Sequence, residues 1–259
     1  MNIRERTAPF STDLLQSQPQ AETNLDGENY SGTGLLLAKV AESFGADIGD
    51  QEVRDWRALL GGAYIIDQLL DVEKSGSVVP HITSILAGEN LEGIRIGSQD
   101  RIRKYMAAQT PERQSEIMDK IGLVGILTEA LTETEEAEEL VRLRNEEADV
   151  YSGLLALPVE GRHDAAQRSV FNDWLASFSR AGYLIDSLVD MKEDHQSGAT
   201  SVRPSLRSRA VVGRHAVSET ATTLRKTPYR AIGQIAMVGF RYQVLNRKPD
   251  LSKLRASQP

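Results

Sequence analysis

The sequence predicts an all-α protein, a single bundle of about eight to ten helices. Apolar residues recur at three- and four-residue steps along most of the 259-residue chain, which is the spacing of one helix face. No segment alternates in the manner of a half-buried strand, and no GxGxxG motif follows a strand-like run. With 40% hydrophobic and 26% charged residues, the composition is that of a globular protein with a substantial core.

The expected helices can be placed in order from Gly34 onward. Residues 1–33 are polar and aperiodic and are expected to form a flexible tail, the helical domain spans 34–246, and 247–259 forms a second flexible tail. Within the domain, helices are expected over residues 34–45, 50–76, 77–88, 100–109, 111–157, 165–194, 218–225 and 229–246.

Proline and glycine set several of these boundaries. Pro80 and Pro111 are placed in first turns, where a missing N–H costs nothing, and Gly88 is placed just after a helix. Asp50 is a candidate N-cap. Trp56 and Trp174 fall on expected helices and are predicted to belong to the core.

Charge and composition exclude several classes of function. A net charge of −7 argues against nucleic acid as the main partner. The chain has no cysteine, so disulfides and cysteine-ligated metals are excluded. Its four histidines are scattered and form no HExxH, which disfavours a zinc hydrolase. No signal peptide or membrane-spanning run is visible, so a cytoplasmic protein is expected.

One motif occurs twice. "AYIIDQLLDVEKSG", residues 63–76, and "GYLIDSLVDMKEDHQSG", residues 182–198, share an aromatic residue, aliphatic pairs, two aspartates four residues apart and a Ser-Gly exit. About 119 residues separate Asp67 from Asp186. This period is too long for a solenoid, but it suits a bundle with two facing walls.

The aspartates of each motif share one helix face. Asp67 and Asp71 lie four residues apart, as do Asp186, Asp190 and Asp194. Like charges at this spacing repel by a few tenths of a kcal/mol per pair, and their place near a helix carboxyl end opposes the helix dipole. Desolvating these carboxylates without compensation would cost far more. A bound cation removes both the repulsion and the desolvation penalty. All-oxygen ligation favours Mg²⁺, with Mn²⁺ as an alternative, bridging carboxylates to substrate phosphates.

A site for a phosphorylated substrate also needs cations from the protein. Arg203 and other arginines follow the second acidic motif. Arg241 and Tyr242 lie in an otherwise apolar run, where they either end a helix or reach an anion. Glu73 and Glu193 either lie next to the metal-binding aspartates without binding the ion themselves, or lie on the surface.

These motifs resemble the class I isoprenoid (terpene) synthase superfamily, most closely its squalene/phytoene-synthase-like and non-standard bacterial branches, which carry DxxxD motifs. The resemblance spans roughly residues 34–246. It implies a helical bundle around a central apolar cavity, with Asp67, Asp71, Asp186, Asp190 and Asp194 holding three Mg²⁺ ions. It also implies that Arg241, Tyr242 and Arg203 bind the diphosphate of a prenyl substrate.

The expected activity is therefore a Mg²⁺-dependent synthase that ionises an allylic prenyl diphosphate and then cyclises or quenches the carbocation. Three alternatives stay open: a prenyl-coupling transferase, an all-α nucleotide pyrophosphohydrolase and a non-catalytic partner subunit. The acid-rich run "EEAEELVRLRNEEAD", residues 135–149, superficially suits the hydrolase. A homodimer is compatible with all of these readings. No recognisable motif specifies the chain length of the prenyl substrate, the skeleton of the product or the oligomeric state of the protein.

Overall fold

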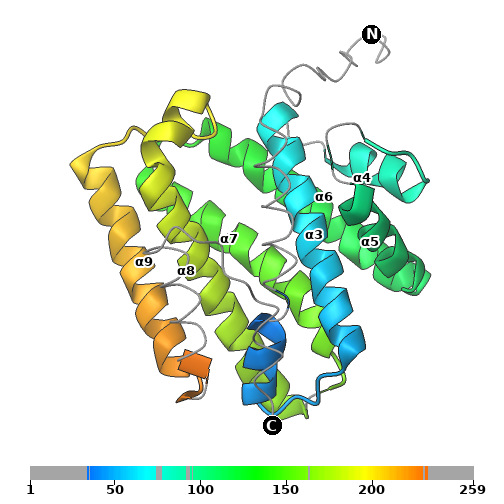
Figure 1. The fold of residues 1–259 in the computed structure, drawn as a ribbon. Coiled ribbons are helices and arrows are strands. Elements are labelled where there is room, and N and C mark those ends of the chain that lie inside the picture. Colours follow the sequence, from blue (N-terminus) through cyan, green and yellow to red (C-terminus); the bar gives the residue numbers. More distant parts are fainter. Residues whose placement is uncertain are drawn as a thin grey trace.

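The computed structural model describes residues 34, 36–73, 78–91, 94, 96–162, 164–229 and 231–232, with the main chain alone for 67, 68 and 70–73. Every regular element in these ranges is helical, which confirms the all-α prediction (Figure 1). Residues 36–43 are helical and precede α3 (Asp50–Glu73), α4 (Val79–Leu86), α5 (Ile96–Ala107), α6 (Pro111–Glu133), α7 (Ala137–Ala156), the 3₁₀ turn η1 (Leu157–Val159), α8 (Ala165–Ser197) and α9 (Leu206–Lys226). Both predicted tails, and the predicted last helix beyond residue 232, lie outside this part of the chain.

Most helix ends have the local chemistry that the sequence indicates. Pro80 lies in the first turn of α4 and Gly88 follows that helix with φ +100°. Helix α6 begins at Pro111, as predicted. The Asp164 side chain accepts a hydrogen bond from the backbone N–H of Gln167 at 2.8 Å and caps α8. That helix ends at Gly198, whose φ of +80° suits glycine.

Several boundaries differ from the sequence predictions, among them the start of α5, which lies at Ile96 rather than at residue 100. Asp50 is the first residue of α3 rather than its cap, and the Glu52 carboxylate instead accepts a hydrogen bond from the Gly49 N–H at 2.8 Å. The predicted region 111–157 divides into α6 and α7. Helix α9 begins well before the expected residue 218, because Ser205 accepts a hydrogen bond from the Ser208 N–H and starts the helix earlier.

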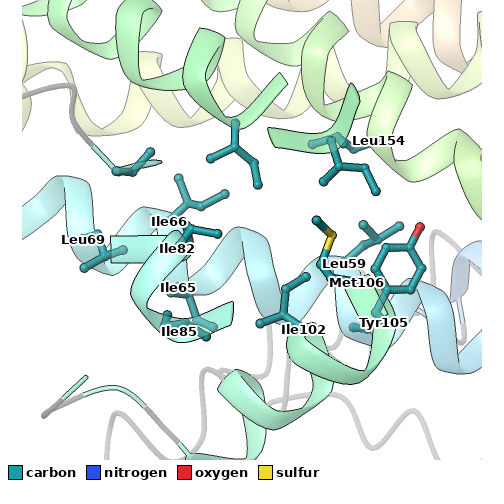
Figure 2. Packing of buried hydrophobic residues seen from close by; sticks show 14 of the residues in the cluster. Leu59, Ile65, Ile66, Leu69, Ile82, Ile85, Ile102, Tyr105, Met106 and Leu154 are labelled. Atoms are coloured by element: carbon teal, nitrogen blue, oxygen red, sulfur yellow. The ribbon is translucent and has the colours of Figure 1, made fainter. Parts of the chain in front are cut away.

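The buried hydrophobic side chains of the described residues form three clusters. The first joins α3 to α4, α5, α6 and α7, and Figure 2 shows part of it around Ile65, Ile82 and Ile102. The second packs residues 36–46 and α3 against α8, and the third joins α6, α7, α8 and α9. Trp56 and Trp174 are 0% and 1% exposed, which confirms their predicted place in the core. Their indole N–H groups donate to the Leu155 carbonyl and the Thr227 hydroxyl.

The arrangement of α3, α7 and α8 decides where a site can form. Helix α7 contacts both α3 and α8. In Figure 1, α3 and α8 run in the same general direction, so their carboxyl ends lie toward the same end of the bundle. The two copies of the acidic motif occupy these ends. None of the helices in the described ranges has the length and hydropathy needed to cross a membrane.

Candidate functional site

A pocket of about 340 Å³ lies between α3, α7 and α8. Its lining is mainly apolar and aromatic: Leu60, Ala63, Tyr151, Leu155, Phe178, Ser179, Gly182, Tyr183 and Asp186. The rings of Tyr151 and Tyr183 stack with their centroids 5.6 Å apart. Among the lining side chains that the structure describes, only Asp186 carries a charge, so this part of the pocket has an apolar body and an acidic edge.

A second, smaller cavity extends the apolar space. Its volume is about 50 Å³, and it shares Leu60, Ala63, Tyr151 and Leu155 with the larger pocket. It is otherwise lined by core side chains of α3, α5, α6 and α7, including Ile102 and Ile117. The apolar space therefore reaches from α8 toward the first core cluster.

Three of the four aspartates of α8 lie along the pocket-facing side of that helix. Ser179, Gly182 and Asp186 line the pocket, and Asp190 and Asp194 follow at four-residue steps, with about 6 Å along the axis between each aspartate and the next. We call Asp186, Asp190 and Asp194 the aspartate stripe. Leu184 and Met191, on the opposite side of the helix, are 0% and 1% exposed. No Lys, Arg or His in the described ranges pairs with the stripe at salt-bridge distance.

The surroundings of Asp186 and Asp194 disfavour the negative charge of these two carboxyls. Burial raises the pKa of Asp186, the neighbouring Asp190 raises it further, and Arg144 opposes both effects. Burial also raises the pKa of Asp194, with Arg144 opposing and Asp186 adding to the rise. Asp186 has an exposed side chain, but it lies at the edge of the pocket rather than on an open surface. A cation bound here would therefore relieve both desolvation and repulsion.

Helix α7 supplies a basic group that the sequence analysis missed. The Arg144 Nη1 donates to the Glu147 carboxylate at 2.8 Å, and the two side chains are 17% and 5% exposed. Burial acts to lower the pKa of Arg144, but Glu147, Asp194 and Tyr183 together raise it. The Arg144 Nε is buried without a hydrogen-bond partner in the described part of the chain. Arg144 is thus a buried positive charge between α7 and the stripe.

A sequence signal for this pair existed. Arg144 and Glu147 lie three residues apart and share a helix side with the buried Leu140 and Leu143. Charges embedded among apolar positions at helical spacing are typical of a buried pair rather than of a solvated face.

The other predicted site residues lie in different settings. Asp67, Asp71 and Glu73 belong to the last turns of α3, and their side chains lie outside the described part. Position 67 is one helical turn beyond Ala63, which lines the pocket. Glu193 is exposed on α8, and Arg203 is exposed in the connection from α8 to α9. Arg241 and Tyr242 lie outside the described residues.

The donor atoms of the stripe fit a hard cation, because all are carboxylate oxygens. The stripe alone does not complete a site: within the described side chains, no three His, Asp or Glu residues converge closely enough to hold a metal ion. The remaining ligands of such a site would have to come from another wall of the pocket.

Comparisons with protein families, with curated proteins and with solved structures find no match to this chain. No family membership is assigned on that basis. The fold and the site together define a helical bundle with an apolar pocket and a carboxylate stripe at its edge.

Proposed function

We propose that the protein is a Mg²⁺-dependent class I terpene synthase that ionises an allylic prenyl diphosphate and then cyclises or quenches the carbocation. The observation that carries this proposal is the direct succession, along one side of α8, of apolar pocket lining and aspartate stripe. A prenyl diphosphate has the same division into a long apolar chain and a strongly charged end. The pocket volume of about 340 Å³ lies within the range of small-molecule sites, roughly 300–1,000 Å³.

The aspartates would hold the metal and the pocket would hold the chain. Asp186, Asp190 and Asp194 on one wall, with Asp67 and Asp71 on the other, would bind Mg²⁺, three ions by the resemblance. Bound Mg²⁺ supplies the positive charge that makes diphosphate a good leaving group. Arg203, Arg241 and Tyr242 would bind the diphosphate oxygens, and Glu73 and Glu193 would support the aspartates.

After ionisation, the walls of the pocket would protect and stabilise the carbocation. Leu60, Leu155 and Phe178 would keep water away from the carbocation. The faces of the stacked Tyr151 and Tyr183 rings could stabilise positive charge, since aromatic faces attract cations. Aromatic residues make up only 5% of the chain, yet three of them meet at this pocket.

One observation weighs against a nucleotide pyrophosphohydrolase built on α7. Five carboxylates of the acid-rich run are engaged by basic side chains: Glu138 by His215 and Arg214, Glu139 and Glu146 by Arg142, Glu147 by Arg144, and Asp149 by Arg180. Ligands for a metal-bound triphosphate would have to be released from these pairs first. Prenyl coupling remains the nearest alternative, because it would use the same stripe with two substrates.

The test is turnover of geranyl, farnesyl and geranylgeranyl diphosphates with and without Mg²⁺, following pyrophosphate release and extractable hydrocarbon. We expect Mg²⁺-dependent release that falls by about 100-fold or more in Asp186→Ala and Asp67→Ala, because each substitution removes charge stabilisation of the leaving group. Asp173→Ala is the matched control, since Asp173 is an exposed aspartate of α8 away from the pocket lining.

The outcomes separate the alternatives. A C–C-coupled product from two substrate molecules would reassign the protein to the transferases. Cleavage of nucleoside triphosphates with every prenyl diphosphate intact would overturn the proposal. Absence of any turnover by the folded protein would favour the partner-subunit alternative.

A further inference from the structure

Helix α9 lies at one edge of the bundle, beside α8 (Figure 1). It packs mainly on α8 and less extensively on α7. Two of its buried residues, Val212 and Ala216, belong to the third core cluster, together with side chains of α6, α7 and α8. The side of α9 opposite to Val212 and Ala216 therefore faces away from the described core.

The outward side of α9 carries a line of exposed apolar residues. Leu206, Val217 and Leu224 are 90%, 70% and 53% exposed, and Ala210 and Ala221 are exposed as well. These five residues follow one another at steps of four, seven, four and three, so they share one side of the helix. We call them the α9 apolar row. A single exposed apolar side chain is ordinary, whereas a contiguous set indicates an interaction surface.

Exposed arginines accompany the apolar row. Arg207, Arg214 and Arg225 lie seven and eleven residues apart, which places them together on one flank of the row. We call these three residues the arginine flank. Arg203, shortly before the first turn of the helix, is also exposed. Arg214 contacts Glu138 of α7 at 3.0 Å, but both side chains are more than half exposed, so this pair is weak and can be exchanged for another anion.

The positive charge of this region contrasts with the charge of the whole chain. The chain has a net charge of −7, yet residues 203–226 contain six Arg and Lys residues and one acidic residue, Glu219. Glu219 lies near Arg180 of α8, whose pKa is raised mainly by its hydrogen bond to Asp149 and further by the charge of Glu219. The one acid of α9 is therefore engaged toward α8, and the arginine flank keeps its net positive charge.

An anionic lipid surface is the partner that matches both features. An amphipathic helix that lies in the plane of a membrane buries its apolar residues at the boundary between head groups and acyl chains, while its basic residues meet the lipid phosphates. A nucleic acid would pair with the arginines, but its phosphates and sugars would leave Leu206, Val217 and Leu224 without an apolar partner.

A second copy of the chain matches the surface less well. Two copies joined through α9 would place the arginines of both in one interface, without acidic partners from this side of the helix. The exposed Leu123 and Ile126 of α6 lie beside acids such as Glu116 and Asp119. A contact between α9 and α6 is head-to-tail, however, and would continue into rings or filaments rather than close as a dimer.

We propose that α9 docks the protein reversibly on an anionic membrane surface. The α9 apolar row enters the boundary between head groups and acyl chains, and the arginine flank, with Arg203, binds lipid phosphates. The row extends about 27 Å along the helix, so α9 lies along the plane of the membrane. Binding of this kind is peripheral, and it does not rest on the proposed synthase activity.

Flotation of the full chain with lipid vesicles tests the proposal. The protein should float with vesicles of phosphatidylcholine that contain about a quarter phosphatidylglycerol, and much less with pure phosphatidylcholine, because the arginine flank needs anionic head groups. Added salt should weaken this binding. Val217→Asp should weaken it about tenfold or more, since it removes a buried apolar contact and adds a repelled charge. Ile126→Asp, on the similarly exposed α6 surface, changes the net charge equally and should bind as the unmodified protein does.

A second pair of variants tests the arginine flank. Arg207→Glu should weaken vesicle binding about fivefold or more. Arg54→Glu is its control, because Arg54 is exposed on α3 and the net charge changes by the same amount. All four substitutions alter exposed side chains, and circular dichroism checks that the helix content is retained. Should Val217→Asp fail to fold, the arginine pair decides the test alone.

Failure of the unmodified protein to float with anionic vesicles would overturn the proposal, as would an equal loss of binding in each variant and its control. Analytical ultracentrifugation detects the rival partner. Self-association that Val217→Asp abolishes, together with absence of vesicle binding, would assign the α9 apolar row to a second copy instead. None of these readouts requires turnover, so failure here and failure of the synthase proposal can be told apart.

Discussion

Helices α7 and α8 pack against each other and are both rich in acidic residues. The acidic residues of the two helices differ in whether basic side chains pair with them. On α7, Glu138, Glu139, Glu146 and Glu147 contact basic side chains, and Asp149 is held by Arg180 through two hydrogen bonds of 2.7 and 2.6 Å. On α8, the aspartate stripe has no such partner among the described residues. Each helix carries five acidic residues, so it is their basic partners, and not their number, that distinguish α8 from α7.

The difference separates two uses of a carboxylate. A buried acid such as Glu147 is compensated within the fold, and its removal leaves an uncompensated charge. An acid whose charge is disfavoured and unpaired is a candidate for binding something from outside. Asp186 and Asp194 meet the second description, and Asp186 also borders a pocket.

Among the substitutions that test this difference between paired and unpaired acids, the largest loss of stability is expected at Glu147. Glu147→Ala leaves Arg144 buried without its partner, and loss of one member of a buried pair costs about 3 kcal/mol of unfolding free energy. Urea denaturation measures this loss. Glu146→Ala on the same helix is the control, because Glu146 and Arg142 are both about half exposed and such pairs contribute little. Equal stability of the two variants would show that Glu147 does not compensate Arg144.

A smaller effect is expected in the pH dependence of stability. Burial acts to raise the pKa of Glu52, but hydrogen bonds from its own N–H and from Gly49, together with Arg162, leave that pKa lowered. A carboxyl whose pKa is lowered in the folded state stabilises the fold at pH values above its ordinary pKa, here 4.5. This stabilisation is lost as the pH falls through the pKa of the folded state. The pKa of Asp186 is instead raised above its ordinary value of 3.8. Ionisation of this carboxyl therefore lowers the free energy of unfolding as the pH rises above 3.8.

Glu52→Gln and Asp186→Asn should therefore differ from the unmodified protein with opposite signs. Near neutral pH the unmodified protein should be more stable than Glu52→Gln, and less stable than Asp186→Asn in the absence of divalent metal. Both differences should shrink on acidification. Urea denaturation across about pH 3 to pH 6 measures both, and slopes of the same sign would contradict the contrast between paired and unpaired acids.

Much of the fold could be predicted from sequence because its signals are local. The prolines at positions 80 and 111 and the glycine at position 88 act within a few residues, and the structure places them as predicted. The start of α9 was missed because its first half is polar and its apolar residues include the exposed Leu206 and Val217. A helix whose outer side is uncovered in this way has no clear apolar face.

The candidate site was only partly predictable, for a different physical reason. Spacing alone places Asp186, Asp190 and Asp194 on one side of a helix. The approach of Arg144 toward Asp194, and the stacking of Tyr151 on Tyr183, depend on how α7 packs against α8. Sequence reasoning that treats each helix separately contains no information on such contacts. The pocket lies between three helices and is inaccessible to it for the same reason.

The smallest effect, and the one that tests the stripe itself, is expected at Asp190. Asp190→Asn removes the central charge and with it two like-charge contacts at four-residue spacing, so the unfolding free energy should rise by about 0.5 kcal/mol without metal. Excess Mg²⁺ should reverse the order, because a ligand that binds only the folded state stabilises the unmodified protein. Asp173→Asn is the control, since the positions four residues before and after it are Ser169 and Ser177. Thermal unfolding with Mg²⁺ or with a chelator measures each difference. An equal Mg²⁺ response in all three proteins would mean that the stripe does not bind the ion, and the synthase proposal would lose its metal site on α8.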